Sequence, residues 1–447
     1  MTEVVLISTD TGVPPQPRIY SYDALGHLRH ATNPETGTTD YIAYDALGNL
    51  LEYRDQNSKE AARNYYIRNE FDKKGRPTVK ARYSASTHVN QRQLNEWRYD
   101  ESEGNAIYKN LLTSAVTRDE GGTNIIEEKF AYLAGSGRLG SKSVYFNMAN
   151  EALPAYTYTI GYGYDGNGNL EGENAAREGA ASIADTRSQY NHGYLNSKGF
   201  GSVVGTGVQD VSYGIDGSPE ILAFTNGTTT TYHKDPVNRL SGITTNKGSL
   251  GLWDSGLYQY DGVHNITNIG DDFFTYDHLS RLTEAVVNHA ATDSPSLPLQ
   301  NVHAITLNYT YDGFGNLLSR KFEGNAAPDL TWMGNQDVRT AFMKSVVFST
   351  SIETSTNRLN SLHINESNDP TEYTYDSNGN VTQDGSIALT YDTRDYTETV
   401  VNETGTHSYY YDSSGERVAA VTVSGGELTE AVYYLRSGSQ VMAEEAM

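Results

Sequence analysis

The sequence predicts an all-β protein built from tandem antiparallel β-hairpins. Three observations predict it: a strand-like alternation of residues, a recurrent turn sequence, and the repetition of both along the chain. In ITLNYTYD, residues 305–312, apolar and aromatic residues alternate with polar ones. A period of two is the pattern of a half-buried β-strand.

The turn sequence that follows is Asp-Gly-Phe-Gly-Asn, residues 312–316. An Asp side chain can bond the backbone two residues further on, and Gly and Asn tolerate the positive φ that tight hairpin turns require. Residues 317–322, LLSRKF, can then begin a return strand. The unit therefore predicts strand, turn and strand, in which Tyr supplies a large ring and a hydroxyl for a partner.

The same unit recurs with variable spacing. Spacings such as 16, 20 and 22 residues leave room for one hairpin per unit and little room for helices. We therefore expect one long antiparallel sheet, whose twist makes it coil into a hollow shell or part of one. We expect residues 1–447 to form a single repeat region. Good copies begin at Tyr22, Tyr44, Phe71, Tyr164, Tyr260, Tyr276, Tyr311, Tyr375, Tyr391 and Tyr411, and degenerate copies lie near residues 130, 213, 232 and 355.

We interpret the repeated residues as architecture. Asp and the Gly-Asn pair form the turn, while Tyr and Leu supply the packed face. The structural positions predicted in this way are Tyr22, Asp23, Gly26, Tyr44, Asp45, Gly48, Asn49, Leu50, Tyr164, Asp165, Gly168, Asn169, Leu170, Tyr260, Asp261, Tyr276, Asp277, Tyr311, Asp312, Gly315, Asn316, Leu317, Tyr375, Asp376, Gly379, Asn380, Tyr391, Asp392, Tyr411, Asp412 and Gly415.

Two segments interrupt the pattern. Residues 171–207 are Ala-rich at first and Gly-rich later, and they lack a clear alternation. We expect a short helix or a loop there. Residues 288–301, NHAATDSPSLPLQN, are typical of a Ser/Pro loop.

Composition excludes several classes of protein. The net charge of −23 argues against nucleic-acid binding, which requires a basic surface, and favours a basic partner. The chain has no Cys, so disulfides and thiolate metal sites are excluded. No stretch is long and apolar enough to span a membrane, and the N-terminus does not resemble a signal peptide. The 34 Tyr and only 12 Pro argue against a disordered chain.

Motifs for metals and cofactors are weak. Asp165, Asn167 and Asn169 have the spacing of a calcium loop, but position 12 of that loop is Ala176 instead of Glu. Residues 161–166 match G-x-G-x-x-G, yet a repeat runs through them. His27 and His264 take the places of Asn and Gly in their turns, and we interpret them as turn variants. We expect no cofactor and no metal.

Motifs for catalysis are equally weak. The sequence contains no nucleophile elbow, zinc-protease motif or phosphate loop. Acidic pairs such as Glu127–Glu128 and Asp271–Asp272 could serve glycoside hydrolysis, which uses two carboxylates. A chain this acidic offers many such pairs by chance. We assign no catalytic residue.

Tyr-Asp-x-x-Gly-Asn-Leu with variable spacing resembles the YD repeat of RHS (rearrangement hotspot) proteins, over nearly the whole chain. That family includes bacterial polymorphic toxins, the RHS component of Tc-type toxin complexes, wall-associated proteins and, more distantly, teneurins. The resemblance implies a hollow β-shell. In the toxins, the shell encloses a C-terminal toxic domain, which an aspartate-dependent core domain cuts from the shell.

The resemblance sets our functional expectations. Residues 433–447 resemble the last repeats before the core domain, and we find neither a core domain nor a variable tail in the chain. We expect a non-enzymatic shell, secreted or on the bacterial cell surface by a route without an N-terminal signal peptide. Its partner would be an enclosed toxin cargo or neighbouring RHS segments. The alternatives are an adhesion or carbohydrate-binding scaffold for cell-surface glycans, and an enzyme on a β-scaffold. Exposed strand edges would favour self-association.

Overall fold

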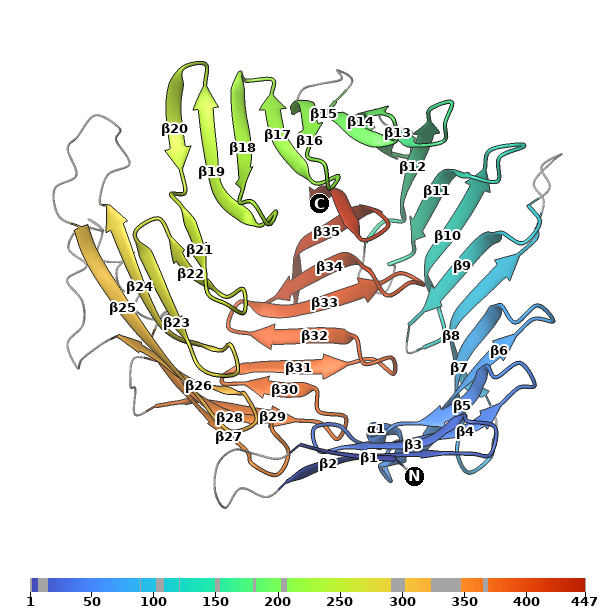
Figure 1. Ribbon diagram of the computed structural model, residues 1–447. Helices are drawn as coiled ribbons and strands as arrows, with labels where there is room; N and C mark the ends of the chain where they lie inside the picture. Colours follow the sequence, from blue (N-terminus) through green and yellow to red (C-terminus); the bar gives the residue numbers. More distant parts are fainter. Residues whose placement is uncertain are drawn as a thin grey trace. The chain divides into compact units, whose positions relative to one another are not determined.

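The protein is almost entirely β-structure in the computed structural model. The structure describes residues 2–6, 15–88, 90–101, 108–119, 121–148, 153–179, 182–201, 207–290, 302–322, 347–364 and 369–446. These residues form 36 strands and one short helix, α1 (Gln56–Lys59) (Figure 1). No helix among them is long and apolar enough to cross a membrane. The prediction of an all-β fold is confirmed.

The chain divides into two compact units. Unit 1 comprises Met1–Leu6, Gln16–Arg187 and Tyr373–Met447, and unit 2 comprises Ile7–Pro15 and Ser188–Glu372. Strands β14 (Ser182–Asn191) and β29 (Thr371–Tyr375) cross the division.

Unit 1 contains an N-terminal run of strands and a C-terminal run. The N-terminal strands are β1 (Thr2–Leu6), β2 (Gln16–Tyr22), β3 (Leu28–Asn33), β4 (Gly37–Tyr44), β5 (Leu50–Arg54), β6 (Tyr65–Phe71), β7 (Pro77–Ser84), β8 (Asn90–Tyr99), β9 (Leu112–Arg118), β10 (Asn124–Tyr132), β11 (Leu139–Phe146), β12 (Tyr156–Tyr164) and β13 (Leu170–Arg177). The C-terminal strands are β30 (Val381–Asp384), β31 (Ile387–Tyr391), β32 (Thr397–Asn402), β33 (Gly405–Tyr411), β34 (Arg417–Ser424), β35 (Glu427–Ser437) and β36 (Gln440–Ala446).

Unit 2 continues the same kind of structure. Its strands are β15 (Tyr194–Phe200), β16 (Val208–Tyr213), β17 (Pro219–Phe224), β18 (Thr228–Lys234), β19 (Leu240–Lys247), β20 (Leu250–Asp254), β21 (Tyr258–Tyr260), β22 (Ile266–Ile269), β23 (Asp272–Tyr276), β24 (Leu282–Ala290), β25 (Val302–Tyr311), β26 (Leu317–Phe322), β27 (Phe348–Ile352) and β28 (Leu359–Ile364).

Pairing between neighbouring strands is antiparallel, and its register carries one recurrent irregularity. In the β25–β26 hairpin, Thr310 pairs with Ser319 but Tyr311 pairs with Leu317, so Leu318 is an extra residue. The same shift precedes the repeat Tyr in the hairpins β2–β3, β23–β24, β29–β30, β31–β32 and β33–β34. A β-bulge of this kind bends the strand and increases its twist. Each repeat therefore adds a similar bend.

The sheet of unit 2 is interrupted between β20 and β21. A Cβ on Gly256 would lie 2.4 Å from the Cα of Gly270, and both glycines have positive φ. The backbones cross too closely there for a side chain. The single continuous sheet that the repeats predict is therefore two sheets.

The interruptions expected from composition differ from the structure in one place. The described residues of 171–207 do not form the expected short helix or loop, because β13, β14 and β15 comprise most of them. Small residues such as Ala175 and Ser197 are buried on these strands, so the low hydrophobicity did not prevent strand formation. Of the loop expected at 288–301, residues 288–290 end strand β24, and the remainder lies outside the described residues.

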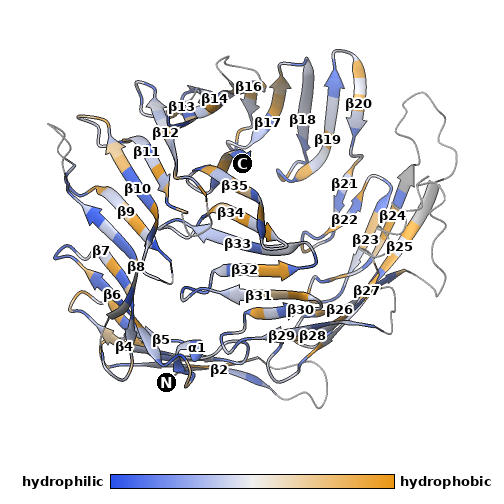
Figure 2. Cartoon of the chain, turned by 180° about the vertical axis from the view of Figure 1, so that it is seen from behind, coloured by the Kyte–Doolittle hydropathy of each residue, from blue (hydrophilic) through white to orange (hydrophobic). Residues whose placement is uncertain are grey.

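The core of unit 1 lies between the N-terminal and C-terminal runs of strands. One face of β10–β13 packs against β34 and β35, and Figure 2 shows apolar residues on these strands. Tyr433 on β35 stacks on Tyr156 at 4.3 Å and meets Phe146 edge-on at 5.0 Å between ring centroids. All three rings are buried. The core therefore fixes the C-terminal strands against the N-terminal sheet.

Candidate functional site

The turn at Asp312 shows what the repeated Asp does. Its Oδ1 accepts hydrogen bonds from the backbone N–H of Phe314 at 3.0 Å and of Asn316 at 2.8 Å. Its Oδ2 accepts from Asn316 Nδ2 at 2.7 Å. The backbone of Asp312 adds a bond to the carbonyl of Asn316 and one from Gly315 N–H. One carboxylate thus organises the whole turn.

The same bond, from the backbone N–H four residues later to the Asp Oδ1, recurs in both units. The side-chain bond from Asn49 is the main cause of the lowered pKa of Asp45, and Asn169 acts likewise on Asp165. The carboxylates so engaged are Asp23, Asp45, Asp72, Asp119, Asp165, Asp235, Asp261, Asp277, Asp312, Asp376, Asp392 and Asp412.

The residue three positions after the Asp is in the left-handed region. Gly48 has φ +84° and Gly315 has φ +97°, and the same holds for Gly26, Gly168, Gly379 and Gly415. A left-handed φ disfavours side chains, which explains the repeated Gly. His264 takes this position with φ +73°, so it is a turn residue.

The residue four positions after the Asp contacts two repeats: the Asp of its own turn and the Tyr of the next repeat. His27 donates its N–H to Asp23, lies 3.1 Å from the second carboxylate oxygen through Nδ1, and stacks on Tyr44 at 4.6 Å. Arg residues at this position lie over the next repeat's Tyr in the same way, in the pairs Arg76–Tyr99, Arg239–Tyr260 and Arg281–Tyr311. No group of three or more His, Asp or Glu in the described residues is arranged to hold a metal ion.

The hydroxyl of the repeat Tyr bonds to the preceding repeat. Tyr311 donates to the carbonyl of Leu282 at 2.9 Å, and the acceptor is the residue five positions after the preceding Asp. Burial, the largest effect, raises the pKa of Tyr311, so its hydroxyl keeps the proton that it donates. Equivalent bonds join Tyr44 to Leu28, Tyr164 to Leu139, Tyr260 to Leu240, Tyr276 to Ile266, Tyr391 to Val381 and Tyr411 to Thr397.

In repeats that lack the Tyr hydroxyl, another side chain donates a hydrogen bond to the equivalent carbonyl of the preceding repeat. Phe71 cannot donate a hydrogen bond, and Asn69, two residues earlier on the same face, donates to the carbonyl of Leu50 at 3.0 Å. Thr350 precedes Ile352 by two residues and donates to the carbonyl of Leu317 at 2.8 Å. The bond between repeats is therefore retained when its residue changes.

The last three repeat turns contact other strands or the helix of unit 1. The turn at 376–380 meets α1, where Asn57 donates to Asn378 Oδ1 at 2.8 Å and to Asp376 Oδ2 at 2.7 Å. In the turn at 392–396, Arg394 donates to Asn95 Oδ1 of β8 at 3.4 Å. We call these two turns and the turn at 412–416 the docked turns.

The third docked turn ends in a buried ion pair. Lys142 of β11 lies 2.8 Å from Glu128 of β10 and 3.2 Å from Asp412, with all three side chains buried. Ser413 N–H donates to Glu128 Oε2 at 2.9 Å. Burial by itself lowers the pKa of Lys142, but the charges of Glu128 and Asp412 outweigh it and raise that pKa. Glu128 is therefore a partner of this turn.

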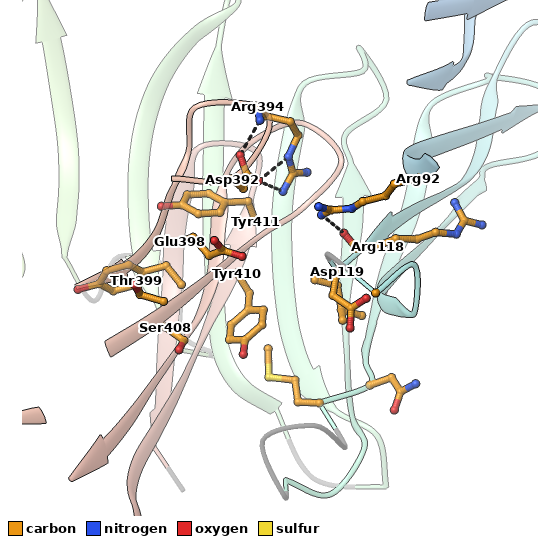
Figure 3. Close-up of a pocket in the computed structure, with 15 residues that line it drawn as sticks. Arg92, Arg118, Asp119, Asp392, Arg394, Glu398, Thr399, Ser408, Tyr410 and Tyr411 are labelled. Carbon is orange, nitrogen blue, oxygen red and sulfur yellow. Dashed lines mark hydrogen bonds and ion pairs between the residues drawn. The ribbon is translucent and has the colours of Figure 1, made fainter. Parts of the chain in front are cut away.

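A cavity of about 280 Å³ lies in unit 1 between the docked turn at 392–396 and strands β8–β10 (Figure 3). Arg92 points into it from β8, and Glu398, Ser408 and Tyr410 come from β32 and β33. Burial, followed by the charge of Arg82, lowers the pKa of Arg92 to about 10. Burial, followed by the charge of Asp392, raises the pKa of Glu398.

The charges around the cavity balance. Its lining includes Arg92, Arg118 and Arg394 together with Asp119, Asp392 and Glu398. Arg394 Nε donates to Asp392 Oδ2 at 2.7 Å, and Arg118 forms an ion pair with Glu96, with 2.9 Å between nitrogen and oxygen. Buried charges arranged in pairs suit a junction between two packed sheets. The repeat residues described above thus organise turns, and two of the predicted ones, Asp392 and Tyr411, also line this cavity.

Comparisons with known proteins agree with this geometry. The family model RHS Repeat matches residues 22–58. No curated protein matches the sequence. The crystal structures of TcdB2-TccC3-TEV and TcdB2-TccC3 align with 95% of this chain, with a TM-score of 0.67 and 17% and 16% identity. The Tc holotoxin pore of Photorhabdus luminescens aligns with 94% of it, with a TM-score of 0.67 and 16% identity.

These findings show that residues 22–58 match an RHS repeat and that the chain has the fold of the TcdB2-TccC3 structures, as the resemblance to YD repeats implies. The chain spans less than a quarter of the length of those proteins, 23% and 22% of the matched chains.

Sequence reasoning did not find the docked turns. Lys142 and Glu128 carry no repeat signal, and their partner Asp412 looks like every other repeat Asp in the sequence. One signal was present. The residue two positions after the Asp is polar in the last three repeats, Asn378, Arg394 and Ser414, but it is also polar in the exposed turns of Lys74 and Asn167, so it does not identify the docked turns by itself.

Proposed function

We propose that this chain is part of the non-catalytic wall of an RHS-type toxin shell, which encloses a toxic cargo and shields it from the producing cell. The observation that carries the proposal is the fold shared with TcdB2-TccC3 along 95% of the chain. Under this proposal residues 1–447 form one wall region of a secreted protein. Neighbouring RHS segments and the cargo would be its partners.

The chemistry of the repeats supports a wall. Each repeat carbonyl, carboxylate and Tyr hydroxyl described above is used within a turn or between adjacent repeats. Such contacts join each unit only to its neighbours, so the sheet can be extended by repetition. The carboxylates of the repeat Asp residues accept hydrogen bonds from their own turns. The acidic composition would favour a basic cargo.

A protease-protection experiment tests the proposal. The protein is purified from the cell that makes it and treated with proteinase K, and the surviving fragments are identified by mass spectrometry. We expect a segment beyond residue 447 to survive while the wall is intact and to be cleaved once urea opens it.

The control is the same segment expressed alone, which should be cleaved at once. Two results would contradict the proposal: a natural product without any such segment, or a segment that is cleaved as fast in the intact protein as in isolation.

A further inference from the structure

A hollow of about 550 Å³ lies in unit 1, on the side of β10–β13 that is turned away from the core. Successive residues of a strand point to opposite faces of a sheet. Val144 on β11 and Tyr158 on β12 belong to the core, so their neighbours Tyr145 and Thr157 lie on the other face, where they line the hollow. The hollow is therefore separate from the packed interior of unit 1.

The floor of the hollow is made of short side chains. Ser143 on β11 pairs with Thr159 on β12, and Thr159 pairs with Ala176 on β13. Directly opposed residues on one face have Cβ atoms about 5 Å apart, so these three side chains are contiguous. Ser143 Oγ and Thr159 Oγ1 are hydrogen-bonded at 2.8 Å, which holds both hydroxyls in place.

Longer side chains stand around this floor. Lys129 on β10 continues the same row of paired residues. In the adjacent row, Glu127 pairs with Tyr145, and Tyr145 pairs with Thr157. Glu178 follows β13, and its backbone N–H donates to the carbonyl of Thr157 at 3.0 Å. The register of four strands thus places short side chains between long ones, and this difference in length creates the hollow.

The charges of the hollow are of both signs. Glu127, Glu178, Lys129 and Arg177 line it. Arg177 is also paired with Glu445 of β36, with 3.5 Å between nitrogen and oxygen. An anionic ligand would lie beside two carboxylates, and a cationic ligand would lie beside an ammonium group, each at a Coulomb cost. An uncharged ligand with several hydroxyls can instead donate to the carboxylates and accept from the lysine.

Tyr145 supplies the apolar surface of the hollow. Its side chain is 38% exposed, whereas Val144 and Phe146 on either side of it along β11 are buried. Its partners in register, Glu127 and Thr157, are polar. An exposed aromatic ring among carboxylate, hydroxyl and ammonium groups suits a ligand that has one apolar face and polar edges.

We propose that this hollow binds an uncharged saccharide of one or two rings. The C–H face of a sugar ring lies on Tyr145, and its hydroxyls donate to Glu127 and Glu178 and accept from Lys129 and Thr157. The volume of the hollow falls within the range of small-ligand sites, roughly 300–1,000 Å³. The site does not depend on the proposed function, because none of these residues belongs to a repeat turn.

A peptide fits this site less well than a saccharide. Extended peptides are commonly recognised through backbone hydrogen bonds to the free edge of a sheet. The floor of the hollow is a sheet face, and the strands beneath it are paired with one another in ladders. Only side chains therefore meet the ligand, and they are the hydroxyl, carboxylate and aromatic groups that a sugar can use.

Ligand-observed NMR on the full chain tests the proposal. The probes are glucose, galactose, mannose, N-acetylglucosamine and their disaccharides, each at about 10 mM, above an expected Kd of about 1 mM for so small a ligand. We expect saturation transfer from the protein to at least one of them. The transfer should be strongest at the ring C–H protons on one face, because that face lies on Tyr145.

Two variants and a matched control locate the site. Tyr145→Ala removes the ring and should weaken binding by at least about tenfold. Ala176→Phe removes no polar group but fills the floor, and it should abolish saturation transfer. Trp253→Ala, which removes an aromatic ring that is 55% exposed on β20 of unit 2, should bind like wild type. Circular dichroism checks that each variant is folded.

Three outcomes would overturn the proposal. They are saturation transfer to none of these sugars, binding by folded Tyr145→Ala that equals wild type, or a stronger signal from the uncharged peptide N-acetyl-diglycine amide than from every sugar. The last result would assign the hollow to a peptide. Should Ala176→Phe fail to fold, the comparison of Tyr145→Ala with Trp253→Ala decides, because both substitutions replace exposed side chains.

Discussion

The turn at residues 277–281 and the turn at residues 392–396 have the same internal hydrogen bonds and different surroundings. Asp277 and Asp392 each bind the backbone N–H four residues later. The first turn exposes Leu279, whereas the second places Arg394 against Asn95 of another strand. The comparison shows that the repeat sequence builds the turn in both places, whereas the surroundings of the residue at its tip differ between them.

The largest effect should come from breaking a docked turn. Lys142→Met leaves Glu128 and Asp412 buried without their cation, and we expect a loss of about 3–5 kcal/mol from the free energy of unfolding of unit 1. The measurement is hydrogen exchange of β11 and β34 in urea. Lys129→Met, an exposed lysine on the other face of β10, should cost less than about 0.5 kcal/mol. Equal losses for both would show that the buried pair is not what holds the turn.

The second-largest effect on stability should come from replacing Gly315, which has a left-handed backbone conformation in the turn at residues 312–316. A Cβ on Gly315 would meet no atom within 4 Å, so Gly315→Ala tests backbone conformation alone. We expect a loss of about 1–2 kcal/mol, because φ is +97°. Ser280→Gly, at the same position of a neighbouring turn with φ +60°, should instead stabilise the protein. The melting temperature of each variant is measured by thermal unfolding. If both melting temperatures shift in the same direction, this explanation of the repeated Gly is refuted.

Bonds between repeats should have similar energies in exposed and docked regions. Tyr311→Phe and Tyr411→Phe each remove a hydrogen bond to the preceding repeat, and we expect each to cost about 1 kcal/mol. Tyr22→Phe is the control, because this Tyr is 49% exposed. Urea midpoints measure all three. A large cost for Tyr22→Phe would mean that the ring, and not the hydroxyl bond, carries the effect.

The smallest effect is a difference in pH dependence between the two kinds of turn. In the exposed turns of Asp45 and Asp165, hydrogen bonds lower the Asp pKa below 3.8. The contribution of these carboxylates to the free energy of unfolding is therefore present above pH 3.8, and it is lost as pH falls through the pKa of the folded state. In the docked region, burial raises the pKa of Asp395 above 3.8. Its contribution is therefore present below pH 3.8 and is lost as pH rises through the folded pKa.

Asp395→Asn tests the docked half of this difference. Asn keeps an oxygen to accept from Asn378 and Asn380, and it tolerates the left-handed φ of +64°. We expect the variant to be more stable than wild type at pH 8 and equal to it near pH 3.5. Hydrogen exchange of β30–β32 at both pH values measures this. A variant that is less stable at pH 8 would show that the charge of Asp395 is favourable.

Much of the fold could be predicted because it is local. Alternation in residues 305–312 and the turn chemistry of Asp312, Gly315 and Asn316 lie within one hairpin, and each hairpin repeats the same bonds. Residues 171–207 were predicted wrongly because small side chains such as Ala175 weaken the alternation while still filling a buried strand face. The break between β20 and β21 could not be predicted, because the repeat pattern holds no information about the close approach of Gly256 to Gly270 found there.

The sequence by itself determined the class of fold, the position of each repeat turn and the role of Asp, Gly and Asn within it. Those features depend on contacts between residues at most a few positions apart. Only the tertiary structure decided which turns are docked, that Lys142 joins Glu128 to Asp412, and which turn residues, such as Leu279, remain in solvent. These depend on contacts across 270 or more residues of chain, as between Lys142 and Asp412, for which a local sequence pattern holds no information.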